Sequence, residues 1–187
     1  ELALKNTHFV NPHGLDDSMH YTTALDLARI AAAFLEVPLL RTISSTRKHT
    51  IANGVEGNSR RLINHNKLLR MYDGCIGLKT GFTKTSGRCL VSAAERDGVT
   101  LIAVTIHAPD DWNDHISMLN YGFSRFTSVQ LCERDDFLSP LHLVGGADTY
   151  VMVTNQEALC VTLPVQHNKI SVTVELPRFE FAPLPAD

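Results

Sequence analysis

The stretch Gly77-Leu78-Lys79-Thr80-Gly81-Phe82-Thr83 decides the fold of this 187-residue chain. It leads into two apolar segments, residues 88–94 and 100–106, in which side chains common in strands predominate. The pair Asp97-Gly98 lies between them, and such a pair is typical of the turn of an antiparallel hairpin. Residues 77–80 are therefore predicted to be a short strand that enters the same sheet.

Two amphipathic helices are predicted to accompany this sheet. The first begins after Thr23 as N-cap, has Asp26 three residues further on, and runs to about Glu36 before Pro38 stops it. The second covers residues 110–126, because large apolar side chains recur there at steps of three and four. These side chains are Trp112, Ile116, Leu119, Phe123 and Phe126. Helices packed on an antiparallel sheet define the α+β fold class.

A second domain is predicted to begin near Ser128, where the helix signals end. Residues 141–144, 150–153, 160–163 and 170–174 are short β-prone runs separated by turn-forming pairs. We therefore predict one α+β domain over residues 1–127 and a small β-rich domain over residues 128–187. We expect the second domain to be truncated, since another strand or two would be needed after Pro183 and Pro185.

The three central residues of the opening stretch, Lys79, Thr80 and Gly81, are suited to holding a peptide. A strand at the edge of a cleft can pair its backbone with an extended peptide, and Gly81 has no Cβ to obstruct the approach. Lys79 offers a fixed positive charge and Thr80 a hydroxyl group to an anion such as a terminal carboxylate. The N–H of Phe82 is placed to stabilise an oxyanion, and Thr83 completes the candidate substrate-binding set. Taken alone, Lys79 is explained equally well as a solvated lysine on a strand.

Five blocks of the chain, in order, carry a resemblance to a known family. They are residues 6–16, 21–28, 62–69, 72–74 and 77–83. The chain resembles the C-terminal portion of the serine D-alanyl-D-alanine carboxypeptidases, which are low-molecular-mass penicillin-binding proteins of peptidase family S11. Lys-Thr-Gly is the third active-site motif of such enzymes. The resemblance implies a partial β-lactamase/transpeptidase-like domain, followed by the start of the family's β-rich C-terminal domain.

The resemblance also implies an activity and its partners. A serine outside this chain would attack the D-Ala-D-Ala bond of a peptidoglycan stem peptide, and water would release the acyl-enzyme. Lys79 would be the catalytic residue supplied by this chain, and β-lactams would bind at the same site. The family uses no metal or cofactor. Its members are exported to the cell envelope, so we expect the export signal and the membrane anchor to lie outside this stretch.

The family's nucleophile is not expected in this chain. Only 78 residues precede Lys79, and the matched blocks already occupy them. The string Ser45-Thr46-Arg47-Lys48 has the required spacing, but a nucleophile needs its lysine one helical turn away on the same face. The residues after Ser45 indicate a strand that leads to a turn at Asn53-Gly54, and the sequence contains no Ser-x-Asn. We therefore expect the chain alone to be inactive, and to bind its missing N-terminal half or a second copy of itself.

Composition excludes several other classes of protein. With 44% hydrophobic residues and a formal net charge of −3, the chain can bury a core and has no basic character suited to nucleic acid. No apolar run has the length of a membrane span. The four cysteines, Cys75, Cys89, Cys132 and Cys160, lack zinc-site spacing, and free thiols are expected.

Two alternative functions are compatible with the sequence. The cluster between His107 and His115, which contains Asp110, Asp111 and Asp114, has residue types that bind metal ions in hydrolases. Its spacing differs from His-Glu-x-x-His, and carboxylates at a helix N-terminus are already explained by the helix dipole. The other alternative is a non-catalytic penicillin-recognising or scaffold module. We expect His8, His13 and His20 to make loop hydrogen bonds, and the family resemblance implies that residues 13–16 line the floor of the cleft.

Overall fold

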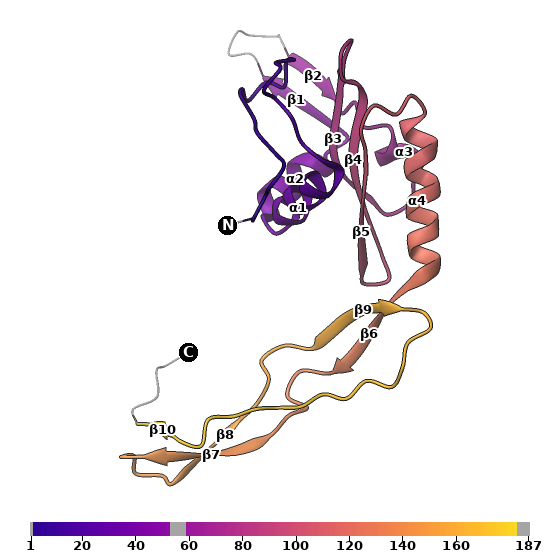
Figure 1. Ribbon diagram of the computed structural model, residues 1–187. Helices are drawn as coiled ribbons and strands as arrows, with labels where there is room; N and C mark the ends of the chain where they lie inside the picture. Colours follow the sequence, from indigo (N-terminus) through magenta and orange to yellow (C-terminus); the bar gives the residue numbers. More distant parts are fainter. Residues whose placement is uncertain (1, 53–58, 183–187) are drawn as a thin grey trace. The chain divides into compact units, whose positions relative to one another are not determined.

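The computed structural model describes residues 2–52 and 59–182, and the chain divides into two compact units between Arg125 and Phe126. The first unit is built on an antiparallel sheet in the order β3-β4-β5 (Figure 1). Its strands are β3 (Cys75–Thr83), β4 (Gly87–Arg96) and β5 (Val99–Thr105). Because β4 lies between its two neighbours, β3 has one free edge in the described part of this sheet.

The turn between β4 and β5 is the predicted hairpin turn. Arg96 pairs with Val99, so the loop consists of Asp97 and Gly98 alone. Both have positive φ values, 47° and 75°, which is the conformation that matches the twist of two antiparallel strands. The prediction of a hairpin at this position is confirmed.

Helices contact the sheet from opposite sides (Figure 1). Helix α4 (Asp111–Arg125) packs on β4 and β5, while α1 (Ala24–Leu35) and α2 (Pro38–Ser45) pack from the other side. Along β4, Leu90 and Ala94 face α4, whereas Glu95 forms an ion pair with Arg41 of α2 at 2.6 Å. This layering is the predicted α+β class.

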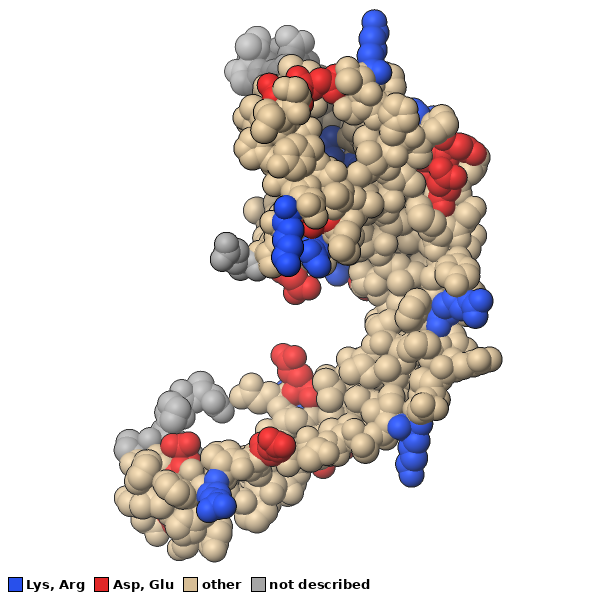
Figure 2. All heavy atoms as spheres, viewed as in Figure 1, with Lys and Arg blue, Asp and Glu red and all other residues tan. Residues whose placement is uncertain are grey.

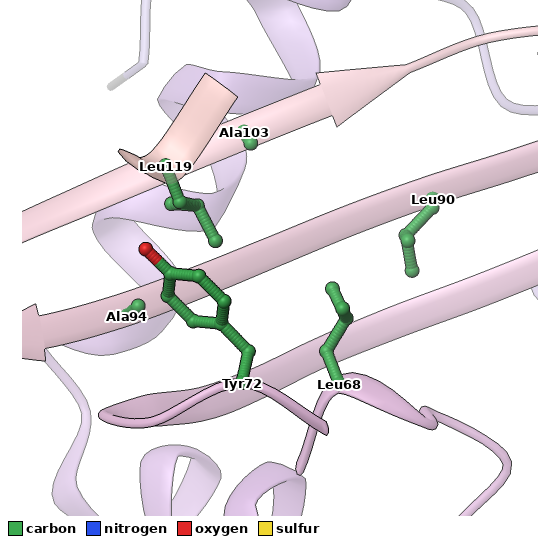
Figure 3. Packing of buried hydrophobic residues seen from close by; sticks show 6 residues of the cluster. All are labelled: Leu68, Tyr72, Leu90, Ala94, Ala103 and Leu119. Carbon is green, nitrogen blue, oxygen red and sulfur yellow. The ribbon is translucent and has the colours of Figure 1, made fainter. Parts of the chain in front are cut away.

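The core of the first unit lies between α4 and the sheet (Figure 3). It consists of Leu68, Tyr72, Leu90, Ala94, Ala103 and Leu119. Leu68 comes from the short helix α3 (Leu68–Met71), which closes one end of the cluster. The predicted apolar face of α4 is confirmed for Trp112, Ile116, Leu119 and Phe123. Phe126 was wrongly included, since α4 ends at Arg125 and Phe126 begins the next strand.

A buried histidine links α4 to the sheet. His115 is fully buried, with Nδ1 2.6 Å from Ser92 Oγ on β4 and Nε2 2.9 Å from Thr105 Oγ1 on β5. Burial lowers the pKa of His115 to about 4, because an imidazolium at this position would lose its hydration. The neutral ring therefore belongs to the folded state at physiological pH.

The N-terminal half of the first unit differs from the prediction in two details. Thr23 caps α1 as expected, accepting a hydrogen bond from Asp26 N at 3.2 Å. The carboxylate of Asp26 does not close a capping box, because it accepts bonds from Asn6 N and Thr7 Oγ1 instead. Pro38 begins a second helix, α2, since proline fits the first turn of a helix.

A second hairpin follows α2. Strand β1 (Lys48–Ala52) pairs antiparallel with β2 (Ser59–Ile63), in agreement with the strand predicted after Ser45. The turn predicted at Asn53-Gly54 lies outside the described residues.

The described residues of the second unit form only strands. Strand β6 (Phe126–Cys132) pairs with β9 (Leu159–Pro164), and β7 (Ser139–Val144) pairs with β8 (Tyr150–Val153) and with β10 (Glu180–Phe181). Three of the predicted strands are thereby confirmed. The prediction for residues 170–174 was wrong, because this run finds no partner strand in the described part of the unit and stays irregular and largely exposed.

Candidate active site

The Lys-Thr-Gly motif lies in the middle of β3, a strand that extends past the predicted limit to Thr83. Thr80 pairs with Leu90 of β4, and Phe82 pairs with Arg88. Since alternate residues of a strand share a face, Thr80 and Phe82 project to the α4 side, where Leu90 is buried. Lys79 and Gly81 belong to the opposite face. The motif therefore presents different chemistry on the two sides of one free edge.

A pocket of about 580 Å³ lies beside this edge. Lys79, Thr80, Gly81 and Phe82 line it from β3, so four of the five predicted substrate-binding residues are brought together. The remaining wall comes from β4, from the first residues of α4, and from the end of β2, α3 and the segment between them. It consists of Arg88, Asp111, Trp112, Ile63, Asn64, His65, Lys67 and Arg70.

Gly81 is open toward the outside of the sheet. A Cβ built on Gly81 would lie 3.7 Å from Cys89 Cβ, which is an ordinary van der Waals distance. The packing of the protein therefore does not by itself require glycine here. The side chain of Phe82 is 70% exposed, and Lys79 is also exposed, with its ammonium group donating a hydrogen bond to the carbonyl oxygen of Thr80.

The α4 side of the pocket contains an ion pair that the sequence did not reveal. Arg88 Nε and Nη2 donate to Asp111 Oδ1 at 3.0 and 2.8 Å. The Arg88 guanidinium carbon is 5.4 Å from the ring centroid of Trp112, and Lys67 Nζ is 5.9 Å from the same centroid. Asp111 therefore does more than interact favourably with the dipole of α4. It anchors a cation at the wall of the pocket.

Thr83 has a partner outside the pocket. Its Oγ1 donates to Asp16 Oδ1 at 2.7 Å, and Ser86 Oγ donates to the same oxygen at 2.8 Å. These hydrogen bonds, that of Thr83 first, hold the pKa of Asp16 below its ordinary value. The loop that contains residues 13–16 thus fastens the end of β3, and it does not line the floor of this pocket as expected.

The three loop histidines make the expected hydrogen bonds. His8 Nδ1 is 2.7 Å from Met19 O, while His13 and His20 accept from backbone N–H groups at 3.2 Å. All four cysteines lie within the described residues and carry free thiols.

The Ser45-x-x-Lys48 string does not form a helical pair. Ser45 is the last residue of α2, and its Oγ donates to Thr42 O at 3.1 Å. Lys48 is the first residue of strand β1. The two side chains are therefore carried by different elements and do not form a nucleophile–base arrangement on one helix face.

The residues of the alternative metal site are engaged elsewhere. Both ring nitrogens of His115 lie within hydrogen-bond distance of hydroxyl groups, and Asp111 is paired with Arg88. No group of three or more potential ligands gathers anywhere in residues 2–52 and 59–182.

In the view of Figure 2, acidic and basic side chains are interspersed over the first unit. Among the described helices, none combines the length and apolarity of a membrane span.

Comparison with known proteins shows the family. The family model described as D-alanyl-D-alanine carboxypeptidase matches residues 1–110. The D-alanyl-D-alanine carboxypeptidase DacC of Escherichia coli is 31% identical over 98% of this chain and 46% of its own length. DacF of Bacillus subtilis is 29% identical over 86% of this chain and 42% of its own length. The chain belongs to the D-alanyl-D-alanine carboxypeptidase family, and it spans less than half the length of these curated relatives.

Solved structures agree in fold. Penicillin binding protein 5 from Haemophilus influenzae has a TM-score of 0.64 at 29% identity, covering 88% of this chain and 48% of that one. A mutant of the Streptomyces K15 DD-transpeptidase has a TM-score of 0.61 at 35% identity, covering 66% of this chain and 50% of that one. The fold of the chain is thus that of the penicillin-binding DD-peptidases.

Proposed function

We propose that this chain is the substrate-docking part of a serine-type D-Ala-D-Ala carboxypeptidase that trims peptidoglycan stem peptides through an acyl-enzyme. One observation carries the proposal: Lys79, Thr80 and Gly81 lie on the edge of β3 that is free in the described sheet, and they line a pocket whose charged side chains are mainly basic. We propose further that residues 1–127 belong to the catalytic domain, that residues 128–187 belong to the β-rich C-terminal domain, and that the protein acts in the cell envelope.

Each motif residue has a distinct part in the proposed reaction. The backbone of β3 pairs with the extended stem peptide and aligns its scissile bond. Gly81 lets the peptide approach, which agrees with a glycine that the protein's own packing does not demand. Phe82 N–H stabilises the oxyanion. Lys79 and Thr80 hold the terminal carboxylate, and Lys79 also tunes proton transfer to the attacking serine.

The attacking serine and its lysine base are supplied by residues outside this chain. Ser45 and Lys48 lie on different elements, so neither fits those roles. The same peptide site would accept β-lactams, whose ring amide bond mimics the D-Ala-D-Ala peptide bond. The N-terminal half of the domain, or a second copy of the chain, would complete the structure.

The chain alone is expected to form no stable adduct with a penicillin, because removing the nucleophile of an acyl-transfer enzyme costs several orders of magnitude in rate. Intact-mass spectrometry after incubation with a labelled penicillin measures this directly. The product of the complete gene serves as the positive control and should gain the mass of one penicillin. An adduct at Ser45 in the chain alone would contradict the proposed division of roles.

A further inference from the structure

The residues at the end of the Lys-Thr-Gly motif have little side-chain packing to hold them. Gly81 has no side chain, and the side chain of Phe82 is 70% exposed. In the described sheet, β3 is supported by β4 on one side only. Because the end of an edge strand opens more easily than its middle, the position of Gly81 and Phe82 depends on what holds the next residue, Thr83.

Asp16 holds Thr83 from a loop that lies far away in the sequence. Thr83 Oγ1 and Ser86 Oγ both donate to Asp16 Oδ1, at 2.7 and 2.8 Å, and Ser86 N donates to Thr83 Oγ1 at 2.9 Å. The Thr83 hydroxyl therefore donates one hydrogen bond and accepts another. Hydrogen bonds to an ionised carboxylate are stronger than those between neutral groups, and this one fixes the point where β3 enters its turn.

The loop that presents Asp16 has hydrogen bonds of its own. Residues 8–21 are closed at their base, where His8 and Tyr21 exchange backbone hydrogen bonds of 2.9 and 3.0 Å. Near the tip, the side-chain amide of Asn11 accepts one backbone hydrogen bond at 2.8 Å and donates another at 3.1 Å. Asp16 follows this turn directly, so its carboxylate is held by a structured loop.

A second element contacts the same turn. The carbonyl oxygen of Ser86 lies 3.0 Å from Nδ1 of His107, in the loop between β5 and α4. Gly87 follows with a φ of +67°, and a Cβ built on it would lie 2.8 Å from the same nitrogen. The β3–β4 turn is thus fixed by His107 as well as by Asp16, and only Asp16 is bonded to the strand that carries the motif.

We infer that Asp16 is a positioning residue for the reaction: by fixing Thr83, it keeps the N–H of Phe82, one residue earlier, in the orientation that receives the oxyanion. This inference rests on the proposed function, which assigns the oxyanion to that N–H. Asp16 is not among the residues that line the pocket, so it acts through β3. A misplacement of about 1 Å at a reacting group can cost about 100-fold in rate, which is why such a distant contact matters.

Kinetics of the complete gene product on a peptide ending in D-Ala-D-Ala test the inference. Asp16→Ala should lower kcat about 10- to 100-fold and change KM less than about threefold, because the lost interaction acts on the transition state. Asp16→Asn keeps an acceptor oxygen at the same place and should retain more than about one third of kcat. A loss in Asp16→Asn as large as that in Asp16→Ala would overturn the inference, since the hydrogen bonds would then not be the cause.

A peptide boronic acid reports on the oxyanion site directly, because its boron becomes tetrahedral on the attacking serine. Its inhibition constant should rise in Asp16→Ala by about the factor by which kcat falls, and it should stay near the wild-type value in Asp16→Asn. Asp17→Ala is the matched control, since Asp17 Oδ1 accepts from Met19 N at 2.8 Å within the same loop. This variant should keep the wild-type kcat and inhibition constant. Equal effects of Asp16→Ala and Asp17→Ala would overturn the inference, because any disturbance of the loop would then suffice.

Hydrogen exchange tests the contact without catalysis. In the complete gene product, the backbone N–H of Ser86 should exchange at least about tenfold faster in Asp16→Ala than in wild type, because its acceptor Thr83 Oγ1 is released. Asp16→Asn and Asp17→Ala should exchange like wild type. Unchanged protection of Ser86 in Asp16→Ala would overturn the inference. A wild-type enzyme that shows the expected exchange but hydrolyses no D-Ala-D-Ala peptide would instead contradict the proposed function.

Discussion

At the scale of single residues, the two faces of β3 divide the chemistry of the site. Thr80 lies on the same face of the sheet as Arg88 and Lys79 lies on the opposite face, although all three line the pocket. The motif residues could be predicted from the sequence because they are consecutive. The pair formed by Arg88 and Asp111 could not, since 23 residues separate them and either side chain has an adequate local explanation.

The first residue-scale prediction concerns Thr80. In the complete gene product, Thr80→Val should lower kcat/KM for a substrate with a free terminal carboxylate, because a hydrogen bond to a charged group worth about 1.5–3 kcal/mol is lost. The change should matter less for the amidated substrate. Steady-state kinetics on both substrates decide the matter, and equal losses would mean that Thr80 does not touch the carboxylate.

The second concerns His115 and pH. The pKa of this group is about 4 in the folded chain and near 6.5 when unfolded, so the unfolded state takes up a proton first as the pH falls. The contribution of neutral His115 to the free energy of unfolding is therefore complete above about pH 6.5 and is lost between about pH 6.5 and 4. Between pH 7.5 and 5, wild type should lose about 2 kcal/mol through this group.

Urea unfolding followed by Trp112 fluorescence measures this effect. His115→Gln should show a flatter dependence of stability on pH than wild type, although it will be less stable at pH 7.5. His13→Gln, which changes an exposed loop histidine, should keep the wild-type slope. A wild-type slope in His115→Gln would show that other groups control the acid sensitivity.

At the scale of elements, sequence periodicity and turn-forming residues correctly predicted those helices and strands whose formation depends on local sequence. Helices α1 and α4, the β4–β5 turn and three of the strands of the second unit were recognised from their patterns. Helix α2 was missed because Pro38 can end one helix or begin another. Strand β6 was missed because Phe126 continues the apolar spacing of α4 directly into it. Residues 170–174 show that an alternating pattern forms a strand only where a partner strand is available.

The entry into β3 gives an element-scale prediction. Gly74 has a φ of +77°, and a Cβ there would lie 2.4 Å from the backbone oxygen of Glu95. Gly74→Ala combines a left-handed conformation with a backbone clash and should cost more than about 2 kcal/mol of stability. Gly14 has nearly the same φ, +76°, and open space around it, so Gly14→Ala should cost only about 1 kcal/mol.

Chemical denaturation of the two alanine variants at one pH makes the comparison. Since both variants share the conformational penalty, the difference between them isolates the contact with β4. Equal losses would show that the turn before β3 can move away from Glu95 at little energetic cost.

At the scale of the whole molecule, the family could be predicted from five ordered sequence blocks. What packs against the exposed apolar side chains could not be predicted, because no local sequence pattern identifies a partner. Phe9, Leu15, Met19 and Tyr21, in the segment before α1, are each more than half exposed, and Phe82 is exposed beside the motif. Apolar surface of this extent usually marks an interface. We propose that the N-terminal half of the catalytic domain covers it.

Light scattering on the isolated chain tests this proposal. We expect self-association when the chain is alone, because apolar side chains are left uncovered. Addition of the N-terminal half as a separate polypeptide should give a one-to-one complex that regains penicillin binding. A strictly monomeric chain, indifferent to the other half, would show that the first unit is a self-sufficient domain.

The free edge of β3 also bears on the solubility of the resting protein. A strand edge left unpaired for a peptide, as the proposed function requires, can equally be joined by any other extended chain, including a misfolded copy of itself. On the proposed function, this edge cannot be covered permanently without closing the site. A lysine and a glycine in its middle interrupt the regular apolar surface on which aggregates grow. Lys79 and Gly81, which the proposed function assigns to peptide docking, would therefore also limit aggregation along this edge.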